Sequence, residues 1–180
     1  MNQYALMLVA LVIPVLASLI EAMGSIGISE RHHSHHDTYV VEASFSRALI
    51  IAMFFMGIVG IILSWLCTMG VFVADSVVVI TFFVAFLVVI FAMWLAMRRY
   101  RVAAYDEYMD ITPFVGGSIH VVYRDIERME WSGLRSGTGY RNLKIYVDSR
   151  PIGMLWGILD LEQILMRVDR YDVLARASNS

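Results

Sequence analysis

The sequence predicts three transmembrane helices followed by a small antiparallel β-meander domain that a C-terminal helix closes. Three observations lead to this α-helical membrane plus α+β fold class. Uncharged apolar runs occupy residues 4–20, 48–69 and 76–97, then short alternating runs follow, and a last stretch has helical spacing. We therefore expect a membrane region at residues 1–97 and a soluble domain at residues 98–180.

The composition supports this division. The 180 residues are 59% hydrophobic with a mean hydropathy of +0.67, whereas soluble domains are close to half apolar. Of the 14 Lys and Arg residues, only Arg31 and Arg47 precede Arg98. The second part carries nearly balanced charge, which argues against nucleic-acid binding. A single cysteine, Cys67, excludes an intramolecular disulfide.

The first apolar run, residues 4–20, is close to the shortest helix that crosses a hydrocarbon core of about 30 Å. Pro14 lies inside it and Glu21 ends it. A cleaved signal peptide is the alternative interpretation. Residues 1–3 contain no Lys or Arg, and no convincing small-residue cleavage site follows. We therefore expect a spanning helix.

The second and third runs, residues 48–69 and 76–97, form a predicted helical hairpin with a short link at Gly70. Their apolarity is continuous, and within lipid only helices or closed barrels satisfy the backbone polar groups. Gly57 and Gly60 are expected to pack within this hairpin. Because the three predicted spans contain no Asp, Glu, Lys, Arg or His, a pump or secondary transporter is disfavoured.

The basic residues predict the orientation. Arg31 and Arg47 lie in the loop at residues 21–47, whereas residues 1–3 and the hairpin link have none. A second basic group follows the third run directly: Arg98, Arg99 and Arg101. With three spans, both groups fall on one side, so the positive-inside rule predicts a multi-pass protein of the cell membrane with its N-terminus outside and its C-terminal domain in the cytoplasm. The second group is also a candidate lipid-headgroup site.

The loop at residues 21–47 contains a candidate metal site. Four of the five histidines of the chain and one aspartate make up this cluster: His32, His33, His35, His36 and Asp37. Neutral imidazoles bind Zn, Cu or Ni. Adjacent histidines in a Gly- and Ser-rich loop do not have the i, i+4 spacing of a helical ligand pair, so a solvated linker that binds divalent metals weakly is the alternative.

Short strands are predicted in the soluble half because apolar residues alternate there. The runs are residues 108–114, 119–123, 126–131, 143–147 and 152–156, with a further strand possible at 100–105. Residues 38–46 contain β-branched and aromatic residues. They are interpreted either as a strand that docks on the C-terminal domain or as the beginning of the second span.

A terminal helix is predicted at about residues 160–172. Its apolar stripe consists of residues at helical spacing: Leu161, Ile164, Leu165, Val168 and Tyr171. Asp160 is the expected N-cap, with Gln163 three residues later as in a capping box. The helix is expected to cover one face or edge of the sheet.

Three short motifs resemble the bacterial pleckstrin-homology-like family of membrane proteins. Arg99-Tyr100-Arg101-Val102 is similar to its entry strand, Tyr123-Arg124-Asp125-Ile126 to its turn between strands, and Leu143-Lys144-Ile145-Tyr146, with the following helix, to its closing portion. The resemblance covers residues 99–168. It implies a reduced version of a seven-stranded domain, and it carries over no catalytic residue.

No sequence motif predicts a reaction. The chain lacks a Gly-x-Ser-x-Gly elbow, a His-Glu-x-x-His helix and a cysteine pair. We expect a non-enzymatic membrane protein without a cofactor that presents a cytoplasmic pleckstrin-homology-like module for protein or lipid interaction. Its expected partners are the lipid bilayer and a cytoplasmic protein or a second copy of the chain. The alternative is a metal-binding or metal-responsive membrane protein that uses the loop around His32–His36.

Overall fold

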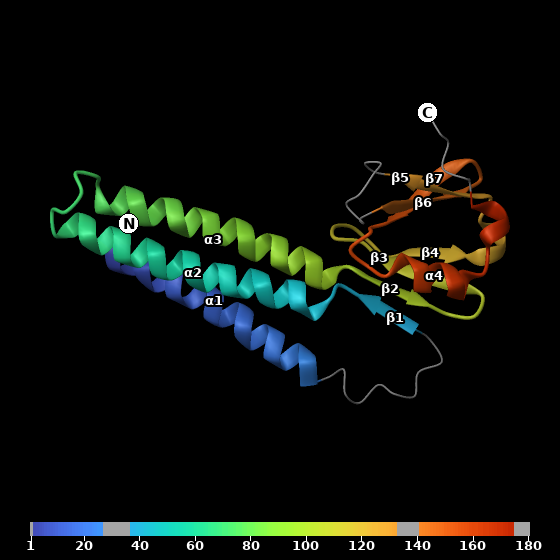
Figure 1. Cartoon of the computed structure of the whole chain (residues 1–180), viewed down its shortest axis with the longest axis horizontal. Coiled ribbons are helices and arrows are strands. Elements are labelled where there is room, and N and C mark those ends of the chain that lie inside the picture. Colours follow the sequence, from blue (N-terminus) through green and yellow to red (C-terminus); the bar gives the residue numbers. More distant parts are fainter. Residues whose placement is uncertain (1, 27–36, 133–140, 175–180) are drawn as a thin grey trace. The chain divides into compact units, whose positions relative to one another are not determined.

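A computed structural model describes residues 2–26, 37–132 and 141–174 of the chain. These residues form two compact units, a three-helix unit and a β unit, and each is described by itself. The β unit combines the chain that follows the third helix with a short segment from between the first two helices (Figure 1). The polypeptide therefore enters the β unit twice.

The three-helix unit confirms the three predicted helices. They are α1 (Gln3–Ile26), α2 (Ala43–Thr68) and α3 (Ser76–Arg99), and each is long and apolar enough to cross a membrane. Helix α1 continues through Pro14 and extends beyond the predicted end of its span. It therefore includes Glu21, against the expectation that no ionisable residue lies within a span. A charge ends an apolar run, but glutamate is itself a good helix former, so the helix continues.

Two glycines allow the helices of this unit to lie side by side (Figure 1). A Cβ atom on Gly60 would lie 2.6 Å from the Cβ atom of Phe83, which agrees with the predicted packing of α2 on α3. A Cβ atom on Gly57 would lie 2.8 Å from the carbonyl oxygen of Ala10. Gly57 therefore faces α1 and not only the hairpin, contrary to our expectation.

Polar side chains join all three helices at the end of the unit that carries the α2–α3 link. Gln3 Nε2 donates to Ser64 Oγ at 3.2 Å, and Ser64 Oγ donates to the carbonyl oxygen of Ser76 at 3.0 Å. Ser76 Oγ in turn donates to Gln3 Oε1 at 3.2 Å. Because Ser64 is fully buried, these bonds satisfy a polar group that would otherwise destabilise the interior.

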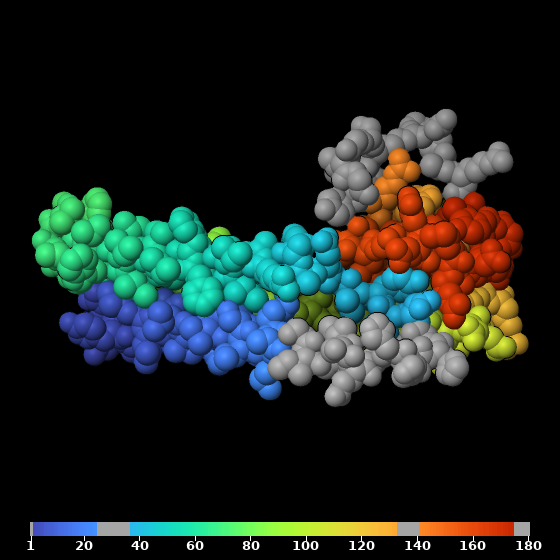
Figure 2. All heavy atoms as spheres, turned by 60° about the horizontal axis from the view of Figure 1, so that its bottom comes forward, coloured from blue at the N-terminus to red at the C-terminus, as the bar shows by residue number. Residues whose placement is uncertain are grey.

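A second polar cluster joins the three helices toward their other end. Trp94 Nε1 donates to Ser46 Oγ at 2.9 Å, and Ser46 Oγ donates to Glu21 Oε2 at 3.0 Å. Helix α1 is thus hydrogen-bonded to α2 near both of its ends, and it packs as an integral part of the unit (Figure 2).

The β unit contains two antiparallel sheets in the described residues, where a single meander was predicted. The four-stranded sheet has the order β1 (Asp37–Val40), β2 (Arg101–Ala104), β3 (Tyr108–Thr112), β4 (Ile119–Val122). The three-stranded sheet has the order β5 (Arg128–Ser132), β6 (Asn142–Val147), β7 (Arg150–Leu155). Short 3-10 turns follow β4 and the C-terminal helix: η1 (Tyr123–Asp125) and η2 (Tyr171–Val173).

The first strand of this unit comes from the connection between α1 and α2. Strand β1 pairs with β2 antiparallel, with Asp37 opposite Ala104 and Val40 opposite Arg101. The docking strand considered for residues 38–46 is therefore present in its first half, while α2 begins at Ala43. Helices α2 and α3 separate β1 from its partner strand in the sequence.

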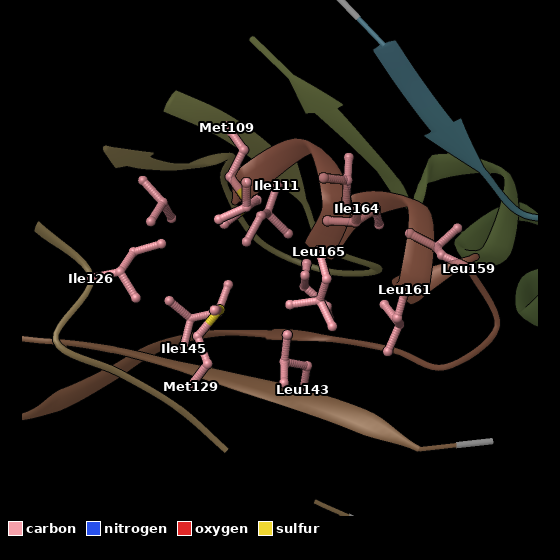
Figure 3. Packing of buried hydrophobic residues seen from close by; sticks show 14 of the residues in the cluster. Met109, Ile111, Ile126, Met129, Leu143, Ile145, Leu159, Leu161, Ile164 and Leu165 are labelled. Carbon is pink, nitrogen blue, oxygen red and sulfur yellow. The ribbon is translucent and has the colours of Figure 1, made fainter. Parts of the chain in front are cut away.

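The hydrophobic core lies between the two sheets and α4 (Leu161–Val168) (Figure 3). Alternate residues of both sheets and the apolar stripe of α4 contribute to it, among them Met109, Ile111, Met129, Leu143, Ile145, Ile164 and Leu165. Asp160 Oδ1 accepts from the backbone N–H of Gln163 at 3.2 Å, which confirms the N-cap. The α-helix ends at Val168, earlier than predicted, because Asp169 adopts a left-handed conformation with φ 49°.

Candidate membrane-interface site

An aromatic cluster lies where the chain leaves α3 and enters β2. The ring of Tyr100 stacks on Phe114 with centroids 4.5 Å apart, and Phe114 meets Trp156 edge to face at 5.4 Å. Tyr100 is buried, and its hydroxyl oxygen accepts a hydrogen bond of 2.9 Å from the backbone N–H of Trp156. This aromatic cluster (Tyr100, Phe114 and Trp156) therefore connects the end of β7 to the chain that leaves α3.

The loop between β3 and β4, residues 113–118, extends from this cluster into solvent, and we call it the rim loop. Val115 is 82% exposed, and space is open around Gly116 and Gly117. Gly116 has φ 101°, a conformation that favours glycine. Its carbonyl oxygen accepts a hydrogen bond from Arg99 Nη2. The rim loop is therefore held beside the last residue of α3.

Of the three arginines predicted to meet headgroups, Arg99 bonds directly to this loop. Arg98 and Arg99 occupy the last turn of α3, where cations favourably oppose the negative end of the helix dipole. Arg101 begins β2 and is exposed, opposite Val40 on one side and Thr112 on the other. Arginine side chains with apolar stems beside exposed apolar residues are typical of the interface between hydrocarbon and lipid headgroups.

The Tyr100 hydroxyl is a structural acceptor. Its burial raises the pKa of Tyr100 above the usual value near 10, and the hydrogen bond from Trp156 offsets only part of that effect. The phenol is therefore neutral at physiological pH. It positions Trp156, which remains 38% exposed, and supplies no titrating group to the site.

The candidate metal ligands are not brought together in the part of the chain that the structure describes. His32, His33, His35 and His36 lie outside the described residues. Asp37 begins β1, and its Oδ2 atom lies 3.5 Å from Arg167 Nε on α4. Within residues 2–26, 37–132 and 141–174, no group of three or more His, Cys, Asp or Glu side chains could hold a metal ion.

Arg167 gives Asp37 a structural role. Its Nη2 atom also lies 2.6 Å from Asp106 Oδ1 in the connection between β2 and β3. The hydroxyl of Tyr39 donates to the carbonyl oxygen of Gln163 at 3.5 Å. The ion pair of Arg167 with Asp37 therefore links α4 to β1, and the two elements lie together in Figure 2.

One further pair of titratable side chains lies on the outer face of the four-stranded sheet. His120 Nδ1 and Asp110 Oδ1 are 2.8 Å apart, and the ring of Tyr108 lies 4.5 Å from the imidazole. Asp110 and His120 are directly opposite each other on β3 and β4. Both side chains are open to solvent, so this cross-strand pair is explained by strand pairing.

Sequence reasoning named the arginines but missed the rim loop, in which Phe114 is partly buried in the aromatic cluster and Val115 is exposed. Phe114 was interpreted as part of a strand, whereas it lies in the loop after β3. The signal that could have located the rim loop is an apolar pair, Phe114 and Val115, directly before Gly116 and Gly117. A turn of that composition has no reason to be apolar in water.

Comparison with known proteins does not add to this description. Neither the protein-family models, the curated proteins nor the solved structures give a match to the chain.

Proposed function

We propose that this chain is a three-span protein of the cell membrane whose β unit is a pleckstrin-homology-like module on the cytoplasmic face. The module contacts lipid headgroups through the rim loop and the neighbouring arginines, and it catalyses no reaction. A four-stranded and a three-stranded antiparallel sheet followed by one closing helix support the pleckstrin-homology-like interpretation. The seven described strands favour a more complete domain than the reduced one inferred from sequence.

The pairing of β1 with β2 is the observation that carries the proposal. Strand β1 precedes α2, and β2 follows α3, so the intervening hairpin must return the chain to the side from which it started. If α2 crosses the bilayer, α3 must cross it in the opposite direction. The connection between α1 and α2 and the C-terminal domain then share one face.

The packing of α1 supports a third span over a cleaved signal peptide. Hydrogen bonds join α1 to α2 through Ser64 and Ser46, and the close approach of Gly57 to Ala10 lies between them. Removal of α1 would leave these buried polar groups and this close contact without a partner helix. With three spans, the positions of Arg31, Arg47 and the arginines after α3 favour a cytoplasmic β unit.

Lipid is a better partner than a protein for the rim loop because the loop is attached to the membrane helix itself. Only Tyr100 separates the last residue of α3 from β2, and Arg99 bonds to the loop at Gly116. Val115 and Trp156 are exposed apolar side chains, and Arg99 bonds to Gly116, the residue after Val115. Exposed apolar side chains together with a cation suit an anionic lipid surface.

The test is the environment of a fluorophore on the rim loop of the full chain. An environment-sensitive dye is attached at Val115→Cys, in a Cys67→Ser background, and the protein is reconstituted in nanodiscs with and without anionic phospholipid. We expect blue-shifted emission and quenching by nitroxide groups placed on lipid headgroups, with a larger effect in anionic lipid. The matched control is the dye at Glu162→Cys on the exposed face of α4. Equal emission and quenching at the two positions would refute lipid contact.

A further inference from the structure

The α2–α3 link, residues 69–75, has an unusually apolar exposed surface for a loop between two helices. Met69 is 61%, Val71 60% and Phe72 48% exposed, and Val73 is fully exposed. In Figure 2 this link is the green end of the helical unit. Between Arg47 and Asp75 the chain contains no charged residue. A soluble loop of this composition would present a contiguous apolar patch to water.

We propose that this link lies in the headgroup layer of the leaflet opposite the β unit, with its apolar side chains directed into the lipid. The partner of the surface is thus the bilayer itself. The inference rests on the proposed spans of α2 and α3, but it is independent of any lipid contact at the rim loop.

Helix length supports this depth. About 20 residues cross a hydrocarbon core of about 30 Å. Counted from Arg47 toward the link, the far boundary falls at about Cys67, and counted back from Arg98 it falls at about Val78. Residues 69–75 then occupy the layer immediately beyond the hydrocarbon. Any tilt of the helices moves the link deeper, because a tilted helix covers less of the bilayer thickness.

The backbone of the link suits a position where water is scarce. The N–H groups of Met69 and Val71 donate to the carbonyl oxygens of Trp65 and Leu66, both at 3.1 Å. At the start of α3, Asp75 Oδ1 accepts from the N–H of Val77 at 2.7 Å. These bonds satisfy some of the polar groups at both helix ends, which lowers the cost of placing the link near hydrocarbon.

The polar cluster of Gln3, Ser64 and Ser76 agrees with this placement. It lies at the same end of the unit, and its side chains bond to one another inside the bundle. The interior of this end is thus polar, while the outside of the link is apolar. A loop in water has polar side chains outside and apolar side chains inside. The opposite arrangement seen here is expected where lipid surrounds the link.

The experiment measures depth with nitroxide spin labels at single cysteines in a Cys67→Ser background, on the full chain in nanodiscs. Labels are placed at Val73→Cys in the link, at Phe55→Cys in the lipid-exposed middle of α2, and at Glu162→Cys on the soluble unit. The readout is the ratio of collision rates with oxygen, which concentrates in lipid, and with a polar nickel complex, which remains in water.

We expect the ratio at Val73→Cys to be several-fold higher than at Glu162→Cys and lower than at Phe55→Cys. If Val73→Cys matches Glu162→Cys while Phe55→Cys shows a membrane value, the link is aqueous and this inference is wrong, although the spans stand. If Phe55→Cys also matches Glu162→Cys, then the spans and the inference fail together.

Discussion

The hydrogen bond between Tyr100 and Trp156 gives a sharp test of the aromatic cluster. In Tyr100→Phe the ring and its stacking on Phe114 remain, but the N–H of Trp156 loses its acceptor. A neutral hydrogen bond contributes about 1 kcal/mol, and a donor left without a partner in a dry site costs about 1–3 kcal/mol. Because Tyr100 is only 1% exposed, water does not readily replace the hydroxyl. We expect a loss of about 1–2 kcal/mol.

Thermal unfolding of the full chain in nanodiscs, followed by near-UV circular dichroism, measures this loss. A loss of 1 kcal/mol lowers the midpoint of a domain of this size by roughly 4–8 °C. Tyr39→Phe is the matched control, since the Tyr39 hydroxyl makes an exposed bond of 3.5 Å to Gln163 and its removal should change little. A midpoint for Tyr100→Phe equal to that of Tyr39→Phe would show that the Tyr100 bond does not stabilise the site.

Two further predictions follow from the structure, and a third follows from the sequence of the loop at residues 21–47. Gly60→Leu should abolish monodisperse protein in detergent, because its Cβ atom would clash with Phe83, whereas Gly117→Leu, which faces open space, should purify normally. Burial raises the pKa of Tyr123 from 10.0 to about 12, so its phenol ionises more readily in the unfolded chain. The contribution of Tyr123 to stability should be constant below pH 10 and fall between pH 10 and 12, and Tyr123→Phe should lessen the fall in alkaline melts. Replacing the four histidines at positions 32–36 with alanine should remove weak Zn²⁺ binding in calorimetry, and unchanged binding would end the metal hypothesis.

The sequence predicted the helices of the three-helix unit because helix formation there depends on composition over the length of one helix. The three helices, and the contact of Gly60 with α3, follow from continuous apolarity and small residues. Gly57 was assigned to the hairpin because the sequence does not specify which neighbour a small residue faces. Glu21 was placed outside the first span because a hydropathy run ends at a charge, although the helix does not.

In the β unit, the sequence predicted the elements but not how the strands pair. Alternation identified most strands and the apolar stripe identified α4, but strand pairing is non-local. Residues 38–46 were interpreted only as a possible strand. The strand that forms, β1, pairs with β2, which begins at Arg101, after both α2 and α3. The division into two sheets depends likewise on tertiary packing around residues such as Ile111 and Ile145. Helix α4 ends early because Asp169 adopts a left-handed conformation. The sequence did not predict this end, because glycine is the usual signal for such a helix end and none is present there.

The sequence predicted the arginines of the candidate site but not its aromatic cluster. Arg98, Arg99 and Arg101 were named because cations after a span are a topological signal. The aromatic cluster was not predicted, since Tyr100, Phe114 and Trp156 come from three distant parts of the chain. Their contact depends on the register of β2 with β3 and on the end of β7, which emerge only when the sheets are assembled.

The pairing of β1 with β2 is the central claim, and a disulfide cross-link tests it most directly. Thr38 and Ala103 are opposite each other in the register. Directly opposed residues of antiparallel strands have Cα atoms about 4.5–5.5 Å apart, which lies within the Cα separation that a disulfide spans. The protein carries Cys67→Ser together with Thr38→Cys and Ala103→Cys. Mild oxidation of isolated membranes that contain it should cross-link the two introduced cysteines. The pair Thr38→Cys with Thr112→Cys, which belongs to the next strand and a different register position, should remain free. Absence of the first cross-link, or equal cross-linking of both pairs, would contradict the shared membrane face on which the proposed function depends.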